Sequence, residues 1–514
     1  MRAKGLLFAT IAAAAITGCA VGPNYKAPVI SMPAEFYVGP ASPPTTQPTQ
    51  PVADRAVDIT RWWAALGDPE LDSLVDRAVR ANLDLRVALT RLQESRAQEY
   101  VISGGTLPLV DFGAGAGRGT GSDSTRGRIP TPLHSAANTS GLKEITEVAG
   151  FDATWEIDLF GRFTRQIEAA RADTQAAYEA RNAVLLSVVA DVARAYVNER
   201  AVRLRLAVAR QNLAIQQQSV DFVTTRFNRG ITNELDVALA RRELATVEST
   251  IAPLQAAIAQ AQRRIAVLVG ELPQNLYAEL DRQMDLPTPP EKIQPGLPVE
   301  LLRRRPDVRQ AERELAASTA RIGVATADLF PRVALIGAGG IQGQGLGRTP
   351  VSEKGIWSVG PSLYWPVLDF GVLDSIVEVQ DLRTQELLYN YRQSVLLAVE
   401  EVDNAISNYQ AQRDRLDRLN EAVAASERAV QLATQRYDRG LTIFLDVLDA
   451  QRQLYALRDQ QAVAQEAVVV QYIALYKALG GGWERNQQVP NIRRPQPALI
   501  AAGRETIAPT PAPR

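Results

Sequence analysis

The sequence of 514 residues predicts a mainly α-helical fold with a small β part, built as an internal tandem duplication. The first observation is a repeat, because Arg226–Thr232 returns as Arg436–Thr442, about 210 residues later, as duplicated structural units do. The second is a seven-residue spacing of apolar residues, which predicts long, closely packed helices. The third is a set of short stretches in which apolar and polar residues alternate, as in β-strands.

The first 18 residues have the features of a signal peptide. A positively charged start is followed by the apolar run Leu6–Ile16, which is too short to span a bilayer stably. Small residues directly before Cys19 resemble a lipobox, in which the thiol receives a diacylglyceryl group and the new amine is acylated. The alternative is an ordinary secretory signal with a chance cysteine.

The chain has few residues for metal binding or catalysis. Cys19 is its only cysteine and His134 its only histidine, which excludes an internal disulfide, a thiol cluster and a His-dependent triad. We therefore expect no catalytic residue, no metal site and no cofactor apart from the lipid on Cys19. The net charge of -1 gives no reason to expect a nucleic-acid partner. After the signal peptide no apolar run is long enough for a transmembrane helix, so a membrane-spanning part would have to be a closed β-barrel.

Heptad spacing predicts the long helices. In the second unit, apolar or aromatic residues fall at every seventh position from Val395 to Tyr437, mostly with small residues three positions later. This pattern is typical of left-handed supercoiled helices. The stretches 162–229 and 372–439 would each be about 100 Å long at 1.5 Å per residue.

Glycines are expected to end these helices. Gly230 and Gly440 follow them at positions suited to a left-handed cap, so helices over 233–270 and 444–479 should run back. A kink is expected at Pro253. Shorter helices should precede the strands of each unit, over 84–105 and 307–329.

Two strands are predicted in each unit, starting after Pro108 and Pro331. Apolar residues occupy the odd positions of 151–158 and 357–367. The opposite face of the first hairpin carries Asp111, Asp152, Thr154, Glu156 and Asp158. One apolar and one polar face is the pattern of barrel strands with lipid outside and water inside, although a half-buried soluble hairpin alternates in the same way. Since four strands cannot close a useful barrel, we expect a homotrimer with 12 strands.

The repeat, the caps and the proline-rich stretches divide the chain into segments. They are a signal peptide (1–18), a lipid-anchored extended segment (19–66), the helices of the first repeat (67–107), the first barrel hairpin (108–160), a long helical hairpin (161–270), an equatorial linker (271–304), the helix of the second repeat (305–330), the second barrel hairpin (331–370), a second long helical hairpin (371–480) and a C-terminal tail (481–514).

Short motifs along nearly the whole mature chain carry a family resemblance. They are Cys19 with Gly22–Tyr25, Trp62–Trp63 with Asp68–Leu71, Trp155–Gly161, Arg303–Val308, Phe330–Pro331 and the two Arg-Gly-x-Thr turns. Together they resemble the TolC/OprM-type outer-membrane factors, in their NodT-like efflux lipoprotein subgroup. The resemblance implies a trimeric outer-membrane barrel on a coiled-coil helical tunnel in the periplasm. It also implies a periplasmic adaptor and an inner-membrane pump of RND type, with drugs or other small toxic compounds as cargo.

The resemblance also implies a constriction at the helical tip, formed by Asp446 and Asp449. Their spacing of three puts both carboxylates on one helix face, and in a trimer each would form a negatively charged ring that favours cations. The alternative is a solvated helix start, where aspartate is common. A closed-state hydrogen bond is implied between Tyr437 and Asp236. Thr442 occupies the position of an arginine that holds TolC closed. A closed state held by that arginine is therefore not expected in this chain.

The turns of the two long hairpins are the implied contact points for the adaptor. They contain Arg229, Gly230, Thr232, Arg439, Gly440 and Thr442. The competing interpretation is a lipid-anchored periplasmic coiled-coil scaffold without a pore, which would form neither detergent-resistant trimers nor conducting channels.

The lipobox generates a direct prediction. We expect Cys19 to be acylated and the mature chain to sort to the outer membrane, because Ala20 follows the cysteine in place of an aspartate that marks inner-membrane retention. Mass spectrometry of the mature N-terminus should find an acylated cysteine as the first residue. A free thiol at that position would contradict the prediction.

Overall fold

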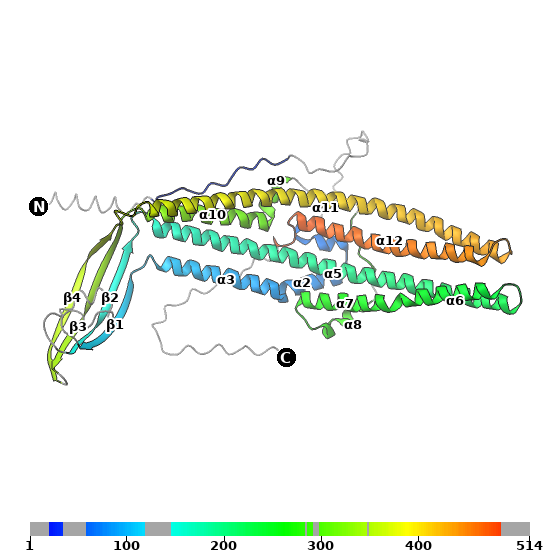
Figure 1. Cartoon of the computed structure of the whole chain (residues 1–514), viewed down its shortest axis with the longest axis horizontal. Coiled ribbons are helices and arrows are strands. Elements are labelled where there is room, and N and C mark those ends of the chain that lie inside the picture. Colours follow the sequence, from blue (N-terminus) through cyan, green and yellow to red (C-terminus); the bar gives the residue numbers. More distant parts are fainter. Residues whose placement is uncertain are drawn as a thin grey trace.

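The structure, a computed structural model, describes residues 20–33, 58–118, 145–282, 285–290, 298–346 and 349–484. Cys19, the signal peptide and the chain after residue 484 lie outside the described residues. In the described part, helices run side by side along one long axis, and a four-stranded sheet leaves them at one end (Figure 1). The predicted fold class, mainly helical with four strands per chain, is confirmed.

Each half of the chain contains helices, two strands and a long helical hairpin. The first half consists of η1 (Ile59–Leu66), α2 (Pro69–Ala81), α3 (Leu83–Gly104), β1 (Leu109–Arg118), β2 (Ile145–Ile157), α5 (Arg162–Asn228), α6 (Glu234–Ser249) and α7 (Ile251–Val269). The connection contains η2 (Pro273–Asn275), α8 (Tyr277–Leu280) and α9 (Pro298–Arg304). The second half consists of α10 (Pro306–Ala327), β3 (Arg332–Leu346), β4 (Thr349–Tyr364), α11 (Val372–Asp438) and α12 (Phe444–Ala478).

The two long helices α5 and α11 contain 67 residues each. They start after Gly161 and Gly371, which adopt the left-handed conformation. Nearby carboxylates satisfy the free amides of both first turns, as Asp158 accepts from the amides of residues 163 and 164 and Asp369 from those of 371 and 373. The capped starts fix the angle at which each helix leaves the sheet.

The kink expected at Pro253 is found as an interruption of the predicted 233–270 helix at Thr250, because Pro253 has no N–H to bond the carbonyl of residue 249. The structure differs from the sequence prediction in two places. The segment up to residue 66, expected to be extended, ends in the 3-10 helix η1, which buries Trp62 and Trp63. The start of the expected C-terminal tail is also packed, since Trp483 is buried and its indole donates to the carbonyl of Arg304.

The sheet is antiparallel, with the order β1-β2-β3-β4. Phe112 pairs with Phe151, and Phe151 lies opposite Gly339, which pairs with Trp357, so the three aromatic side chains share one face. All three are exposed, whereas Asp152, on the other face, is buried. The two faces thus divide into apolar and polar as the alternation indicates.

Paired tryptophans fasten the sheet to the helices in both halves. The indole of Trp155 donates to the carbonyl of Thr106 at 3.0 Å, and that of Trp365 to Leu329 at 3.1 Å. These donors and acceptors correspond to each other in the register of the duplication. Equivalent hydrogen bonds therefore join the sheet to the helices in both halves of the chain.

The main core lies at mid-height of the helices. Trp62 is fully buried, stacks on Tyr476 and donates from its indole to the carbonyl of Gly481 at 3.2 Å. Tyr472 donates to the carbonyl of Trp62 at 3.2 Å. The start of the first half and the end of the second are thereby packed together.

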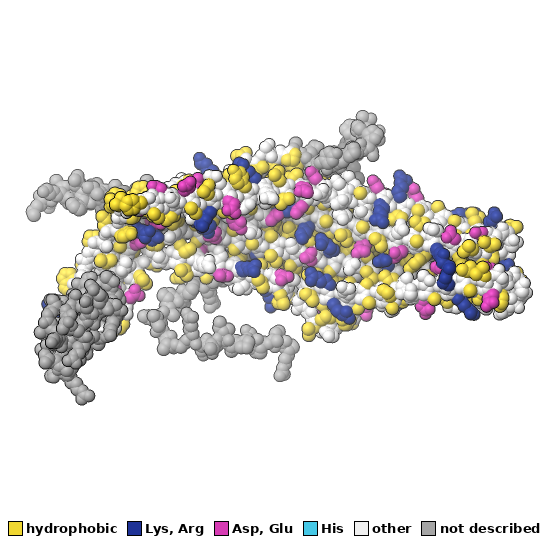
Figure 2. All heavy atoms as spheres, in the orientation of Figure 1, with side chains coloured by type: hydrophobic (Ala, Val, Ile, Leu, Met, Phe, Trp, Pro, Cys, Tyr) yellow, Lys and Arg dark blue, Asp and Glu magenta, His cyan; other side chains and the backbone are white. Residues whose placement is uncertain are grey.

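Apolar side chains also reach the surface. Figure 2 shows them gathered where the helices meet the sheet, and exposed Leu368, Phe370 and Val372 lie at this junction. Within the described ranges, none of the helices combines the length and the apolar character that crossing a bilayer requires.

The mid-height core makes a stability prediction. Asp68 caps α2 by accepting from the amides of Glu70 and Leu71, and its second oxygen accepts from the Tyr196 hydroxyl at 2.6 Å. Burial raises the pKa of Tyr196, so the hydroxyl stays a donor. Tyr196→Phe should lower stability by about 1–3 kcal/mol, because it leaves a buried carboxylate oxygen without its partner.

Thermal unfolding of the purified protein measures this effect. Tyr178→Phe is the matched control, since Tyr178 lies on the same helix and its hydroxyl bonds to none of the described residues. Equal melting temperatures for both variants and the wild type would show that the Asp68 contact contributes nothing.

Candidate functional site at the helical tip

The two long hairpins reverse direction through equivalent turns. Gly230 (φ 73°) and Gly440 (φ 71°) adopt the left-handed conformation that ends α5 and α11. The next amides, of Ile231 and Leu441, donate back to the carbonyls of residues 226 and 436 at 2.9 Å, the six-residue closure of a glycine C-cap. A side chain at either glycine would meet open space, so the backbone conformation alone demands glycine.

A small apolar core joins the two hairpins just behind these turns. It consists of Val220, Val223, Val237, Ala240, Tyr437, Phe444, Val447 and Leu448. Because its members come from α5, α6, α11 and α12, the two turns are held as one unit at the end of the molecule (Figure 1).

The predicted constriction residues lie on this unit. Asp446 and Asp449 are exposed on the first turns of α12, while Val447 and Leu448 between them are buried in the tip core. The Thr442 hydroxyl donates to the Asp446 carboxylate, and the equivalent Thr232 donates to Asp236. Asp449 has no hydrogen-bond or ion-pair partner in the described part of the chain. Two neighbouring carboxylates thus face outward with little to neutralise them.

Tyr437 lies at the centre of the tip core. Its side chain is only 6% exposed, and its ring contacts those of Phe222 and Phe444. Its hydroxyl has no hydrogen-bond partner among the described residues, and Asp236 is bonded to Thr232 instead. The hydrogen bond between Tyr437 and Asp236 is not formed in this chain, and it stays a prediction for a closed channel.

An arginine that the sequence analysis did not single out holds the two hairpins together. The guanidinium of Arg226 lies over the rings of Tyr437, at 4.8 Å, and Phe222, at 5.6 Å. Farther along, Arg452 pairs with buried Glu243 at 2.6 Å. Arg226 opens the repeated motif, but its counterpart Arg436 is exposed, so the motif gave no sign of which arginine makes the contact.

The residues expected to contact an adaptor are accessible. Arg229, Gly230, Arg439 and Gly440 are exposed, and Thr232 and Thr442 are half-buried. The next residues after the glycines, Ile231 and Leu441, are 57% and 62% exposed. Each turn therefore presents one guanidinium beside one apolar side chain.

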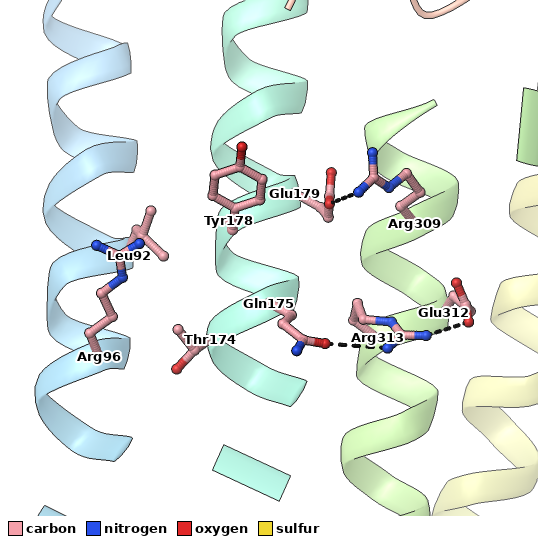
Figure 3. Close-up of a pocket in the computed structure, with 9 residues that line it drawn as sticks. All are labelled: Leu92, Arg96, Thr174, Gln175, Tyr178, Glu179, Arg309, Glu312 and Arg313. Atoms are coloured by element: carbon pink, nitrogen blue, oxygen red, sulfur yellow. Dashed lines mark hydrogen bonds and ion pairs between the residues drawn. The ribbon is translucent and has the colours of Figure 1, made fainter. Parts of the chain in front are cut away.

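A cavity between α3, α5 and α10 is lined mainly by polar side chains (Figure 3). Its charges neutralise one another, as Arg309 pairs with buried Glu179 at 2.6 Å and Arg313 with Glu312. Burial raises the pKa of Glu179, and Arg309 opposes this shift. With its cations already paired inside the protein, this cavity offers no evident site for a charged ligand.

Comparison with known proteins agrees with this architecture. The model of the family described as "Outer membrane efflux protein" matches residues 74–271 and 297–481, most of the chain. This chain belongs to the outer membrane efflux protein family. Its helices and sheet are thus those of an outer-membrane channel component of an efflux system.

Individual relatives match over nearly their full length. Nodulation protein T of Rhizobium leguminosarum bv. trifolii is 30% identical over 474 residues, which are 91% of this chain and 95% of that protein. Cation efflux system protein CusC of Escherichia coli O6:H1 is 30% identical over 479 residues, 92% of this chain and 98% of CusC. The solved structure of the outer-membrane channel OprN superimposes with a TM-score of 0.78 at 36% identity, covering 91% of this chain and all of that one.

The tip geometry predicts unequal roles for the two duplicated arginines. Arg226→Met keeps the length of the side chain and removes the charge over Tyr437. It should therefore loosen the contact between the hairpins by about 0.5–1 kcal/mol. Hydrogen–deuterium exchange of peptides spanning residues 437–448 should become a few-fold faster. Arg436→Met, at the exposed counterpart, is the matched control and should exchange like the wild type. Identical behaviour of the two variants would contradict the role given to Arg226.

Proposed function

We propose that three copies of this chain form a continuous outer-membrane exit duct, through which compounds delivered by a pump pass without any catalysed step. β1 and β4 are the outer strands of the sheet, and their free edges can pair with neighbouring copies to give a closed wall of 12 strands. The duplication supports this arrangement, because three copies supply six similar units around one axis. The homotrimer is part of the proposal.

The length of the helices supports a link to the inner membrane. Each 67-residue helix is about 100 Å long and carries the tip far from the sheet. We assign the tip to a periplasmic adaptor and an inner-membrane pump of RND type. The exposed Arg229 and Arg439, with the turns that contain Gly230 and Gly440, are the proposed contacts. CusC is named for cation efflux, and this chain is assigned the wider class of small toxic compounds.

The gate is assigned to Asp446 and Asp449. The observation that carries this assignment is the exposure of both carboxylates on one face of α12 at the tip. If this face points toward a threefold axis, three copies bring six carboxylates together. Like charges at short distance repel, so the closed state needs neutral contacts that offset the repulsion. The proposed bond between Tyr437 and Asp236 is one such contact. The positive charge of Arg226, which lies over the Tyr437 ring, also lowers the negative charge of the tip.

The opposite end is assigned to the outer membrane by two features. The exposed aromatic face of the sheet, with Phe112, Phe151 and Trp357, suits contact with lipid. A diacylglyceryl group on Cys19 is the second anchor.

Single-channel recording in planar bilayers tests both levels of the proposal. The wild-type protein should insert as a detergent-resistant trimer and conduct, with cations preferred. Replacing Asp446 and Asp449 by alanine should lower the ratio of cation to anion permeability toward 1, because the fixed negative charge is removed. The same change should weaken block by multivalent cations. Asp414→Ala with Asp417→Ala is the matched control, with the same charge change and spacing on exposed residues of α11.

The possible outcomes distinguish the proposed duct from the proposed gate. A monomeric protein that never conducts would contradict the duct and favour a lipid-anchored scaffold. A conducting trimer whose double variant keeps wild-type selectivity and block would contradict only the aspartate ring, and the two carboxylates would be ordinary helix-start residues.

A further inference from the structure

Ion pairs join the two long hairpins a short way behind the tip. α12 of the second hairpin packs on α11 and also on α5 of the first hairpin (Figure 1). The guanidinium of Arg452 in α12 donates to the carboxylate of Glu243 in α6 at 2.6 Å. That of Arg205 in α5 donates to both carboxylate oxygens of Asp459 in α12, at 2.8 and 3.1 Å. Both pairs therefore connect the first hairpin to the second within one chain.

These contacts lie close to the proposed gate. Arg452 follows Asp446 by six residues, which is about 9 Å along α12 at 1.5 Å per residue. Glu243 is only 6% exposed, so separating it from Arg452 would leave a buried carboxylate without its partner. The pair of Arg205 and Asp459 is bidentate, a geometry that adds both energy and specificity. The two hairpins of one chain thus resist separation near the tip.

The duplication indicates which residues would meet where two copies adjoin. The hairpins share one register, about 210 residues apart, and the equivalent contacts Thr232–Asp236 and Thr442–Asp446 follow it at their turns. In the proposed ring of three copies, six similar units follow one another around the axis. The second hairpin of one copy then lies beside the first hairpin of the next copy, much as the first lies beside the second within a chain. We call this surface between copies the seam.

The bidentate pair has a counterpart at the seam that keeps the arginine and lacks the acid. Arg205 corresponds to Arg415, whereas Asp459 corresponds to Ser249. Both Arg415 and Ser249 are exposed in the single chain. A serine hydroxyl can accept a hydrogen bond from a guanidinium but carries no charge. The contact between copies is therefore weaker at this position than the contact within a chain.

The second pair shows the same change. Arg452 corresponds to Arg242, whereas Glu243 corresponds to Gln453. The side chains of Arg242 and Arg415 have no hydrogen-bond or ion-pair partner in the described part of the chain. Loss of the acid at two separate positions makes the seam the less firmly held of the two interfaces between hairpins.

We infer that the two hairpins of one chain move as one body, and that the duct opens along the seams. Glu243 and Asp459 are the positioning residues, because they hold the second hairpin, which carries the gate residues Asp446 and Asp449, against the first. The inference rests on the homotrimer and the gate of the proposed function. It assigns the opening movement to whole chains, with the ion pairs of each chain intact throughout.

Chemical cross-linking of the purified full-length protein, recorded in planar bilayers, tests the inference. The duplication supplies matched cysteine pairs: Glu243→Cys with Arg452→Cys within a chain, and Gln453→Cys with Arg242→Cys at the seam. A short bismaleimide should link the first pair inside monomers and the second into dimers and trimers on a denaturing gel. Linking within chains should leave the open probability unchanged, whereas linking the seams should lower it about tenfold or more, because the parted state is disfavoured. The wild type, with Cys19 as its only cysteine, is the control for the reagent.

Added acids provide a second test that needs no cross-link. Ser249→Asp with Gln453→Glu supplies the missing carboxylates to Arg415 and Arg242 of the neighbouring copies. New ion pairs at all three seams must then separate on opening, so the open probability should fall about tenfold. The matched control adds Arg242→Gln and Arg415→Gln to the same variant and should restore the wild-type open probability.

Closure by the link within chains would overturn the inference, and so would unchanged gating when the seams are linked. A trimer in which the pair at residues 242 and 453 forms no link between copies would contradict the seam itself. If the cysteine variants fail to fold, the acid variant decides, because it changes only exposed residues. Wild-type open probability in that variant would overturn the inference. A monomeric mass by light scattering would contradict the proposed duct and the inference with it, whereas a conducting trimer confines any failure to the seam.

Discussion

Two helices of 67 residues determine where every other element of the chain lies. A helix in a protein gains most of its stability from packing an apolar face, so a helix about 100 Å long needs apolar partners along much of its length. Shorter helices supply them end to end: α3, α2 and α7 pack on α5, and α10 and α12 pack on α11 (Figure 1). Each junction between the shorter helices must then satisfy its free backbone groups inside the protein. Buried Asn82 does so between α2 and α3, where it caps the amide of Leu85 and donates to the carbonyl of Leu268.

Buried arginines connect irregular segments to the long helices. Arg200 of α5 is 1% exposed and donates to Glu70 and to the carbonyls of Leu280 and Arg282. Arg305 bonds Glu401 and the carbonyl of Ala478 in the same way. Arg165 makes the same kind of contact with the carbonyls of Val21 and Gly22. The planar guanidinium suits the task, because it can serve a carboxylate and several carbonyls at once and stays charged when buried.

The two halves share an architecture but have diverged at their ends. At the tip, the guanidinium of Arg226 lies over two aromatic rings, while Arg436 is exposed. At the sheet, Ala20 lies against Gly161, whereas no described residue of this chain lies against Gly371. Around a threefold axis these differences would alternate, so that six similar units carry two kinds of tip and two kinds of junction. The two halves therefore present different surfaces at the tip and at the sheet without any new domain.

The sequence by itself determined the elements whose cause is local. The seven-residue spacing predicted α5 and α11, Gly230 and Gly440 predicted the turns, and the repeat predicted that both halves share one plan, because periodicity and backbone freedom are properties of short segments. It also placed Asp446 and Asp449 correctly beside a turn. Only the tertiary structure decided that Tyr437 packs under Arg226, and that Val21 and Gly22 contact Arg165 and Gly323. Those contacts join residues far apart in the chain, and the choice between a residue and its duplicated counterpart depends on which neighbours the packing brings within reach.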